Sequence, residues 1–316
     1  MIRTHFIARL ALVALVASLT PMRATNPSAN STRLVDVQMR NIVYHYTEQT
    51  SVHIVTLRGQ LEPIKGDIPV FDDKTSFILR IASAEMTISP ASLSNVLNSW
   101  VFNKPDAPLK GVAVQIDQQR LRITGRLHSK GDIPFETEGE ISASQDGRIR
   151  LHTDKVKALH VPVKGLMDLL GLQIANLIKT GKVQGVEIEN DDILLDPTKL
   201  LPPPRIEGKI TAVRLERDAI VEVFGGSLRL PAMNVPYPNY MAYRGNKLRF
   251  GKLTMADTDM VIIDMNPQDP FDFFLDHYPE QLVAGYTKQT PAYGLRVYMR
   301  DYNKLPGHKA GRRNAP

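Results

Sequence analysis

The clearest structural pattern in this sequence is Gly111-Val-Ala-Val-Gln-Ile-Asp-Gln-Gln-Arg-Leu-Arg-Ile123. Apolar residues recur at every second position on both sides of the polar connector Asp117–Arg120, which is the period of half-buried strands. A short polar connector between two such runs is typical of an antiparallel hairpin. The segment therefore predicts two neighbouring antiparallel strands, each with one apolar face.

The same alternation recurs along the chain from Val35 onward. Further examples are Ile149-Leu151, Val186-Ile188, Val213-Leu215 and Val221-Val223. Two helices are predicted between the strands, the first beginning at Ser89-Pro90 and the second running from Val161-Pro162 to about Thr180, before Gly181. The first gathers Leu93, Val96, Leu97, Trp100 and Val101 on one face, and the second gathers Val163, Leu166, Met167, Leu170, Ile174, Leu177 and Ile178.

A pentapeptide repeat suggests how the chain is organised. Lys65-Gly-Asp-Ile-Pro69 recurs as Lys130-Gly-Asp-Ile-Pro134, and an alternating segment, a helix and a strand follow each copy. Two copies are too few for a solenoid, which needs at least three. We therefore expect a domain with a duplicated lobe over residues 30–226. From about Ser227 the composition becomes aromatic and Asp-rich, so residues 227–302 are expected to form a C-terminal extension packed on that domain.

The excess of basic residues lies at the two ends. The chain has 39 Lys and Arg against 33 Asp and Glu, but residues 30–302 hold 32 bases and 33 acids. Arg3 and Arg9 precede the apolar run Leu10–Leu19, which is the order of a secretory signal peptide, so we expect residues 1–29 to be a signal and the protein to be periplasmic or otherwise extracytoplasmic. Residues 303–316 are expected to be a disordered basic tail, with attraction to a membrane surface as the alternative. The nearly neutral body gives no support to a nucleic-acid partner.

The sequence lacks the usual catalytic signatures. It contains no Gly-x-Ser-x-Gly elbow, no His-Glu-x-x-His and no Gly-rich phosphate loop, and without Cys it has no thiol nucleophile or thiolate ligand. Glu136 with Glu138, and Glu187 with Glu189, lie two residues apart in alternating segments, which places each pair on the outward face of a strand. We therefore expect no enzyme activity, no catalytic residue, no cofactor and no metal.

One acidic segment, Asp257–His277, leaves two interpretations open. Asp269, Asp272 and Asp276 would lie on one face of a short helix, opposite the apolar residues Phe271, Phe274 and Leu275. They could gather a divalent cation, or they could form the polar face of an amphipathic helix whose N-terminus favours an anion. Because the segment lacks the ligand order of a calcium loop, we favour the amphipathic helix. A hydrolase that uses this cluster is the weakest of the functional alternatives.

The predicted strands carry more apolar surface than two helices can cover. A sheet with one apolar face must be covered, so this sheet closes over itself or over a ligand. The first outcome is a dry core and the second an elongated apolar groove. For an exported protein, an apolar groove indicates lipid.

Several apolar, glycine and proline patterns between Gly111 and about Gly226 resemble one known family. They are Gly111-Val-Ala-Val-Gln-Ile116, Gly147-Arg-Ile-Arg-Leu-His-Thr153, the helix start Val161-Pro162 with Leu166, Met167, Leu169 and Leu170, Leu200-Leu-Pro-Pro203, and Ala219-Ile-Val-Glu-Val-Phe-Gly225. The segment is similar to the LmeA-like lipid-binding proteins of bacterial envelopes, which are related in fold to the tubular proteins typified by bactericidal/permeability-increasing protein. The resemblance implies an α+β fold, with a strongly curved antiparallel sheet wrapped around one long helix and a second shorter helix. It implies no catalytic residues.

The functional prediction is an exported lipid-binding, or lipid-transfer, protein that holds the acyl chains of a phospholipid or other lipid between the 162–180 helix and the sheet. The predicted lipid-binding residues are Leu93, Leu97, Trp100, Leu166, Met167, Leu170, Ile174, Leu177 and Ile178. The alternative is a non-enzymatic structural or interaction protein of the cell envelope, with a closed dry core and a partner-binding face in residues 227–302.

Overall fold

Strands dominate the structure of this chain. The computed structural model describes residues 34–128, 132–154, 157–158, 185–189 and 191–307. The described residues belong to one compact unit, and 55% of them are in strands against 12% in helical turns of any kind. The strands are β1 (Val35–Thr47), β2 (Thr50–Pro63), β3 (Phe77–Ile88), β4 (Leu109–Asp117), β5 (Arg120–His128), β6 (Asp132–Ala143), β7 (Ile149–Thr153), β8 (Lys157–Ala158), β9 (Val186–Glu189), β10 (Asp192–Leu195), β11 (Arg205–Glu207), β12 (Lys209–Leu215), β13 (Ile220–Gly225), β14 (Tyr240–Gly245), β15 (Leu248–Phe250), β16 (Leu253–Met255), β17 (Thr258–Asp264), β18 (Phe271–Phe274), β19 (Tyr286–Gln289) and β20 (Leu295–Met299).

The helices are all short in the part of the chain that the structure describes. They are α1 (Pro90–Val96), α4 (Pro197–Leu200) and α5 (Tyr278–Val283), with a π-helical turn η1 (Leu97–Val101) and two 3-10 turns, η2 (Leu275–His277) and η3 (Tyr302–Lys304). The start predicted at Ser89-Pro90 is confirmed, because the Ser92 backbone N–H donates to Ser89 Oγ at 3.1 Å and Pro90 occupies the first turn. The helix predicted over 162–180 lies outside the described residues.

The expected α+β fold, with a strongly curved antiparallel sheet around one long helix and a second shorter helix, is wrong. The described helices have four to seven residues, and most of the structure is sheet. The physical reason is that strands supply the cover for other strands. Buried residues of both sheets, among them Ile54 of β2 and Leu121 of β5, belong to one continuous apolar cluster.

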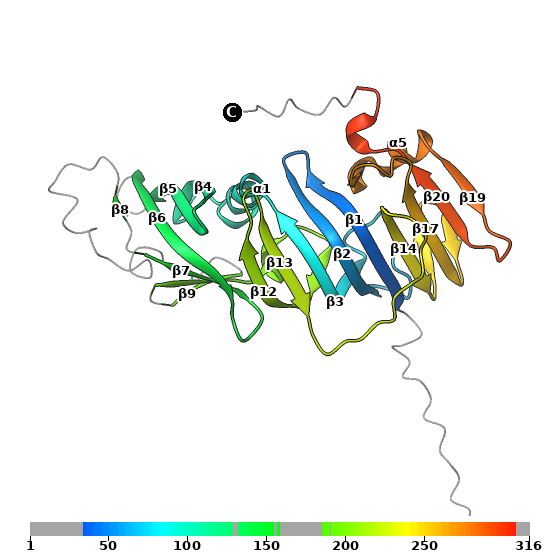
Figure 1. The fold of residues 1–316 in the computed structure, drawn as a ribbon, viewed down its shortest axis with the longest axis horizontal. Coiled ribbons are helices and arrows are strands. Elements are labelled where there is room, and N and C mark those ends of the chain that lie inside the picture. Colours follow the sequence, from blue (N-terminus) through cyan, green and yellow to red (C-terminus); the bar gives the residue numbers. More distant parts are fainter. Residues whose placement is uncertain (1–33, 129–131, 155–156, 159–184, 190, 308–316) are drawn as a thin grey trace, which may run out of the picture. The chain divides into compact units, whose positions relative to one another are not determined.

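Two sheets hold most of the strands (Figure 1). The large sheet has the order β12-β13-β3-β2-β1-β14-β17-β20-β19, with β11 also paired to β3 and β18 also paired to β1. The small sheet has the order β4-β5-β6-β7-β10-β9, with β8 paired to β6, and β15 forms a separate pair with β16. Three pairings are parallel, namely β1 with β18, β3 with β11 and β17 with β20. β14 and β18 therefore join the large sheet through hydrogen bonds to β1, and β17, β20 and β19 extend it beyond β14.

The hairpin predicted from the 111–123 segment is confirmed as β4 and β5. Asp117 pairs with Arg120 in antiparallel register, and the two residues between them have positive φ angles of 46° at Gln118 and 72° at Gln119. Positive φ at both central residues is the geometry whose twist matches two antiparallel strands joined by a two-residue turn.

The two sheets share a topological repeat. In each sheet, a two-stranded hairpin adjoins a run of three further antiparallel strands. In the large sheet, hairpin β12–β13 is followed by β3, β2 and β1, and in the small sheet, hairpin β9–β10 is followed by β7, β6 and β5. A glycine occupies the same crowded place in both: a Cβ on Gly59 of β2 would lie 2.5 Å from the Arg80 carbonyl oxygen, and a Cβ on Gly139 of β6 would lie 2.5 Å from that of His152. The repeated pentapeptide is not what marks this correspondence. Residues 65–69 lie in the connection after β2, whereas residues 132–134 begin β6.

Candidate functional site

Three adjoining apolar cavities occupy the core among the described residues. The central cavity, of about 70 Å³, is lined by side chains from both sheets and from α1 and η1. The large-sheet cavity, of about 50 Å³, touches it at Tyr46, which lines both. The small-sheet cavity, also of about 50 Å³, shares Leu97, Ile123, Leu151 and Leu195 with it. The three cavities therefore adjoin through residues that line two of them at once.

Hydrogen bonds from α1 and η1 to the edge of the small sheet fix one wall of the central cavity. Asn98 donates to the Val112 carbonyl at 2.7 Å and accepts from the Val112 N–H at 2.8 Å. Ser94 Oγ accepts from the Val114 N–H at 2.9 Å. These side chains pair the backbone of edge strand β4, which would otherwise be open to another chain. The same contacts hold Leu93 and Leu97 against the cavity.

The lining of the central cavity is apolar apart from Tyr46, Thr87 and Glu222, among the residues described. Glu222 lies on β13 between Ile220 and Phe224 on the face that points into the core, since both of these are buried in the main apolar cluster. Its cross-strand neighbours are Met86 on β3 and Val213 on β12. The structure therefore places one carboxyl group within a row of apolar side chains.

Burial changes the proton affinity of the two ionisable groups in the central cavity. The surrounding apolar side chains displace water from Glu222 and so raise the pKa of its carboxyl from 4.5 to about 7. Burial also raises the pKa of Tyr46, and the negative charge of Glu222 raises it further. In the described part of the chain, no cation or hydrogen-bond donor is paired with Glu222 to oppose this. Glu222 therefore takes up a proton at a higher pH than an ordinary glutamate does.

Sequence reasoning missed Glu222. The alternation predicted Val221 and Val223 as the apolar face of this strand, yet Ile220 and Phe224 also face the core and Val221 is itself buried. When both faces of a strand carry apolar residues, the alternating pattern fits either face equally well. The sequence alone therefore does not show whether Glu222 points into the core or toward solvent. The Glu pairs were placed correctly, because Glu187 and Glu189 are exposed and Glu136 and Glu138 alternate with buried Phe135 and Thr137.

The predicted lipid-binding residues are only partly brought together. Leu93 and Leu97 line the central cavity, and Leu97 lines the small-sheet cavity as well. Trp100 lies on η1 with 43% of its surface exposed and lines none of the three cavities. The remaining predicted residues lie outside the described part of the chain, namely Leu166, Met167, Leu170, Ile174, Leu177 and Ile178.

The acidic segment does not form the amphipathic helix predicted for it. Asp272 lies in strand β18, because Phe271 and Phe273 alternate toward the core, and Asp276 lies in η2. Each of the three acids also contacts a different side chain. Asp269 contacts Lys304 at 2.9 Å, Asp272 contacts His45 at 2.8 Å and Asp276 contacts Lys74 at 2.8 Å.

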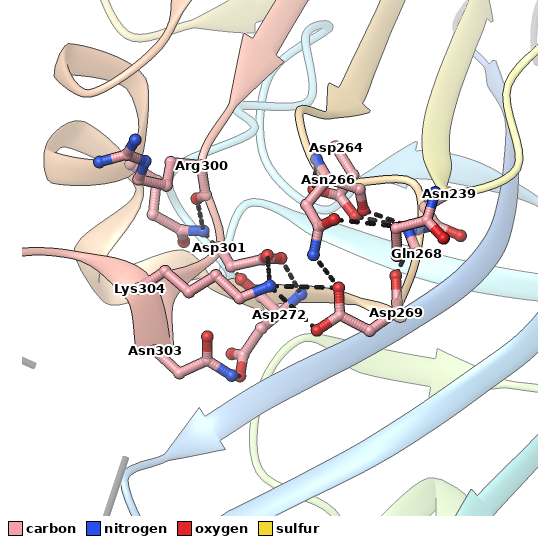
Figure 2. A network of polar contacts seen from close by, with 11 residues as sticks. Asn239, Asp264, Asn266, Gln268, Asp269, Asp272, Arg300, Asp301, Asn303 and Lys304 are labelled. Atoms are coloured by element: carbon pink, nitrogen blue, oxygen red, sulfur yellow. Dashed lines mark hydrogen bonds and ion pairs between the residues drawn. The ribbon is translucent and has the colours of Figure 1, made fainter. Parts of the chain in front are cut away.

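Figure 2 shows the part of this segment that forms a polar network. Lys304 bridges Asp269 and buried Asp301, each at 2.9 Å, and Asn239 donates to Asp264 at 2.9 Å. Burial raises the pKa of Asp264 to about 6. Among the described residues, no group of three or more His, Cys, Asp or Glu side chains could hold a metal ion. The network instead ties η3 to β18 and to the turn that precedes it.

Comparison of the chain with protein-family models, with curated proteins and with solved structures finds no match. The resemblance to the LmeA-like proteins therefore stays a prediction. Within the described residues, no helix has both the length and the apolar character needed to cross a membrane.

Proposed function

We propose that this protein is a non-catalytic, extracytoplasmic lipid-binding protein that accommodates an acyl chain in its core. The observation that carries the proposal is the set of three adjoining apolar cavities, which pass from the large sheet through the central cavity to the small sheet. Flexible aliphatic side chains normally pack closely enough to fill cavities of this kind. Their continuity along both sheets supports an elongated apolar ligand.

The side chains that divide the cavities are the ones that a bound chain would displace. Ile123 and Leu195 stand between the central and the small-sheet cavity and are only partly buried. Each methylene of a ligand that leaves water for this surface contributes about 0.8 kcal/mol. A few methylenes therefore supply useful affinity without a polar anchor, and the ligand class is a phospholipid or another lipid with an acyl chain.

The direct test is the lipid content of the full-length protein purified without detergent. We expect organic extraction and native mass spectrometry to reveal an acyl lipid in stoichiometric amount. Delipidated protein should then bind diphenylhexatriene, an uncharged apolar probe whose fluorescence increases out of water. If no lipid co-purifies and the probe does not bind, the core is dry and the envelope-protein alternative replaces lipid binding.

A pair of matched variants locates the binding. Ile123→Phe adds volume where two cavities meet and should weaken probe binding at least tenfold. Ile116→Phe makes the same change in the adjacent strand of the same sheet, at a partly buried residue that lines none of the three cavities. It should leave binding unchanged. Equal losses in both variants would mean that the effect is on folding and not on the cavity.

A further inference from the structure

The inward carboxyl of Glu222 has no hydrogen-bond or ion-pair partner among the described residues. Its neighbours across the sheet are Met86 and Val213, and Ile220 and Phe224 flank it on its own strand. A leucine at this position would continue the apolar row. Glu222 is half-buried. A polar group that loses contact with water without gaining a partner is uncommon in folded proteins, because it gives up hydrogen bonds to water.

The position of Glu222 connects it with the ligand cavities. The side chain of Glu222 lines the central cavity. Among the described residues that line this cavity, the other ionisable side chain is Tyr46 of β1, which interacts electrostatically with Glu222. Tyr46 also lines the large-sheet cavity. The polar groups therefore lie on the large-sheet side of the central cavity, and the wall shared with the small-sheet cavity is wholly aliphatic. A ligand with one polar end and one apolar chain fits this gradient in only one direction.

Carboxyl chemistry decides which polar end fits. A carboxylate accepts hydrogen bonds and carries negative charge, so it favours an ammonium group or a hydroxyl that donates to it. It repels a second anion, and this repulsion is strong where water is excluded. Lys and Arg, which would compensate a ligand anion, are absent from the described lining of the central cavity.

We infer that the lipid held in the central cavity ends in a hydrogen-bond donor, an ammonium or hydroxyl group that meets Glu222, and that Glu222 excludes lipids ending in a carboxylate. This inference rests on the proposed lipid-binding function and narrows its ligand class. The chain of the ligand then extends past Ile123 toward the small-sheet cavity, and its polar end stays beside Glu222 and Tyr46.

Three ligands of equal chain length test the inference. Dodecylamine, dodecanol and dodecanoate, each below its critical micelle concentration, compete with diphenylhexatriene for the delipidated full-length protein at pH 7.5. In the wild type, the amine should displace the probe at a concentration at least tenfold lower than dodecanoate, with the alcohol between them. Glu222→Gln keeps the shape of the side chain without its charge and should reduce this difference to less than threefold.

The control variant is Glu85→Gln. Glu85 lies on the neighbouring strand β3 and forms a solvent-exposed ion pair with Arg214, so its substitution should leave the order of the three ligands unchanged. Lowering the pH to 5.5 protonates Glu222 and should weaken the preference of the wild type for dodecylamine over dodecanol, because neither of these ligands titrates between pH 5.5 and 7.5, Met86 and Val213 do not titrate and Tyr46 stays neutral. Dodecanoate is left out of this comparison because its own carboxyl takes up protons near that pH.

The possible failures differ from one another. If the probe binds and all three ligands displace it equally, or if Glu222→Gln leaves the order unchanged, the assignment of Glu222 is overturned while lipid binding stands. If the wild type does not bind the probe, the proposed function is overturned and the assignment of Glu222 is overturned with it.

Discussion

Replacing Glu222 by glutamine should change how the stability of the protein depends on pH. The unfolded chain binds a proton at this residue near pH 4.5, whereas the folded protein does so near pH 7. The folded state therefore holds the proton more tightly, so stability from this group is fully present below pH 4.5 and is lost as the pH rises through 7. A pKa that moves from 4.5 to about 7 corresponds to about 3 kcal/mol.

The assay is urea unfolding between pH 4.5 and 8.5, followed through the fluorescence of the single tryptophan, Trp100. The free energy of unfolding of wild type minus that of Glu222→Gln should fall by about 3 kcal/mol from pH 4.5 to pH 8.5. Other titrating groups, including Asp264, cancel in this difference. Glu85→Gln, which removes a carboxyl from a solvent-exposed ion pair, is the matched control. A constant difference for Glu222→Gln would refute the argument that the cavity desolvates this carboxyl.

Three further predictions concern packing and buried charge. Gly139→Ala should lower the free energy of unfolding by about 1–3 kcal/mol, because the added Cβ would lie 2.5 Å from the His152 carbonyl oxygen. Gly226→Ala is the control and should leave stability unchanged, because its added Cβ would meet no atom within 4 Å. Asn98→Ala should cost about 1–3 kcal/mol and speed amide exchange in β4, because it leaves two backbone groups without their partner. Lys304→Met should lower the free energy of unfolding by more than about 1 kcal/mol, because the buried carboxylate of Asp301 loses its cation. Lys74→Met should cost less, because the ion pair of Lys74 with Asp276 is exposed. Equal urea midpoints for these two variants would contradict this reasoning.

Local signals were sufficient for some elements of this fold. The 111–123 hairpin follows from alternation and a short polar turn, and the start of α1 follows from a capping serine with proline behind it. Both depend on contacts between residues that are close in the sequence, so the pattern contains the information needed.

Other elements depend on partners that are remote in the sequence. Phe271, Phe274 and Leu275 have a spacing that suits a helix, but parallel pairing of residues 271–274 with β1, more than 200 residues earlier, makes this segment a strand. Glu222 was missed for a related reason, since Ile220 and Phe224 are covered by distant strands as fully as Val221. The apolar character of the core was predictable from the sequence, whereas the carboxyl group that lines the central cavity, Glu222, was not.

The order of strands in the large sheet has a consequence for biosynthesis. Strands β1 to β3 are made first, yet β3 pairs with β13 and β1 with β14, both of which leave the ribosome more than 100 residues later. The small sheet, in contrast, comes from one continuous interval, residues 109–195. A growing chain can thus complete the small sheet while both sides of the first three strands still lack partners. Until β14 emerges, those strands expose unpaired edges to any other chain nearby.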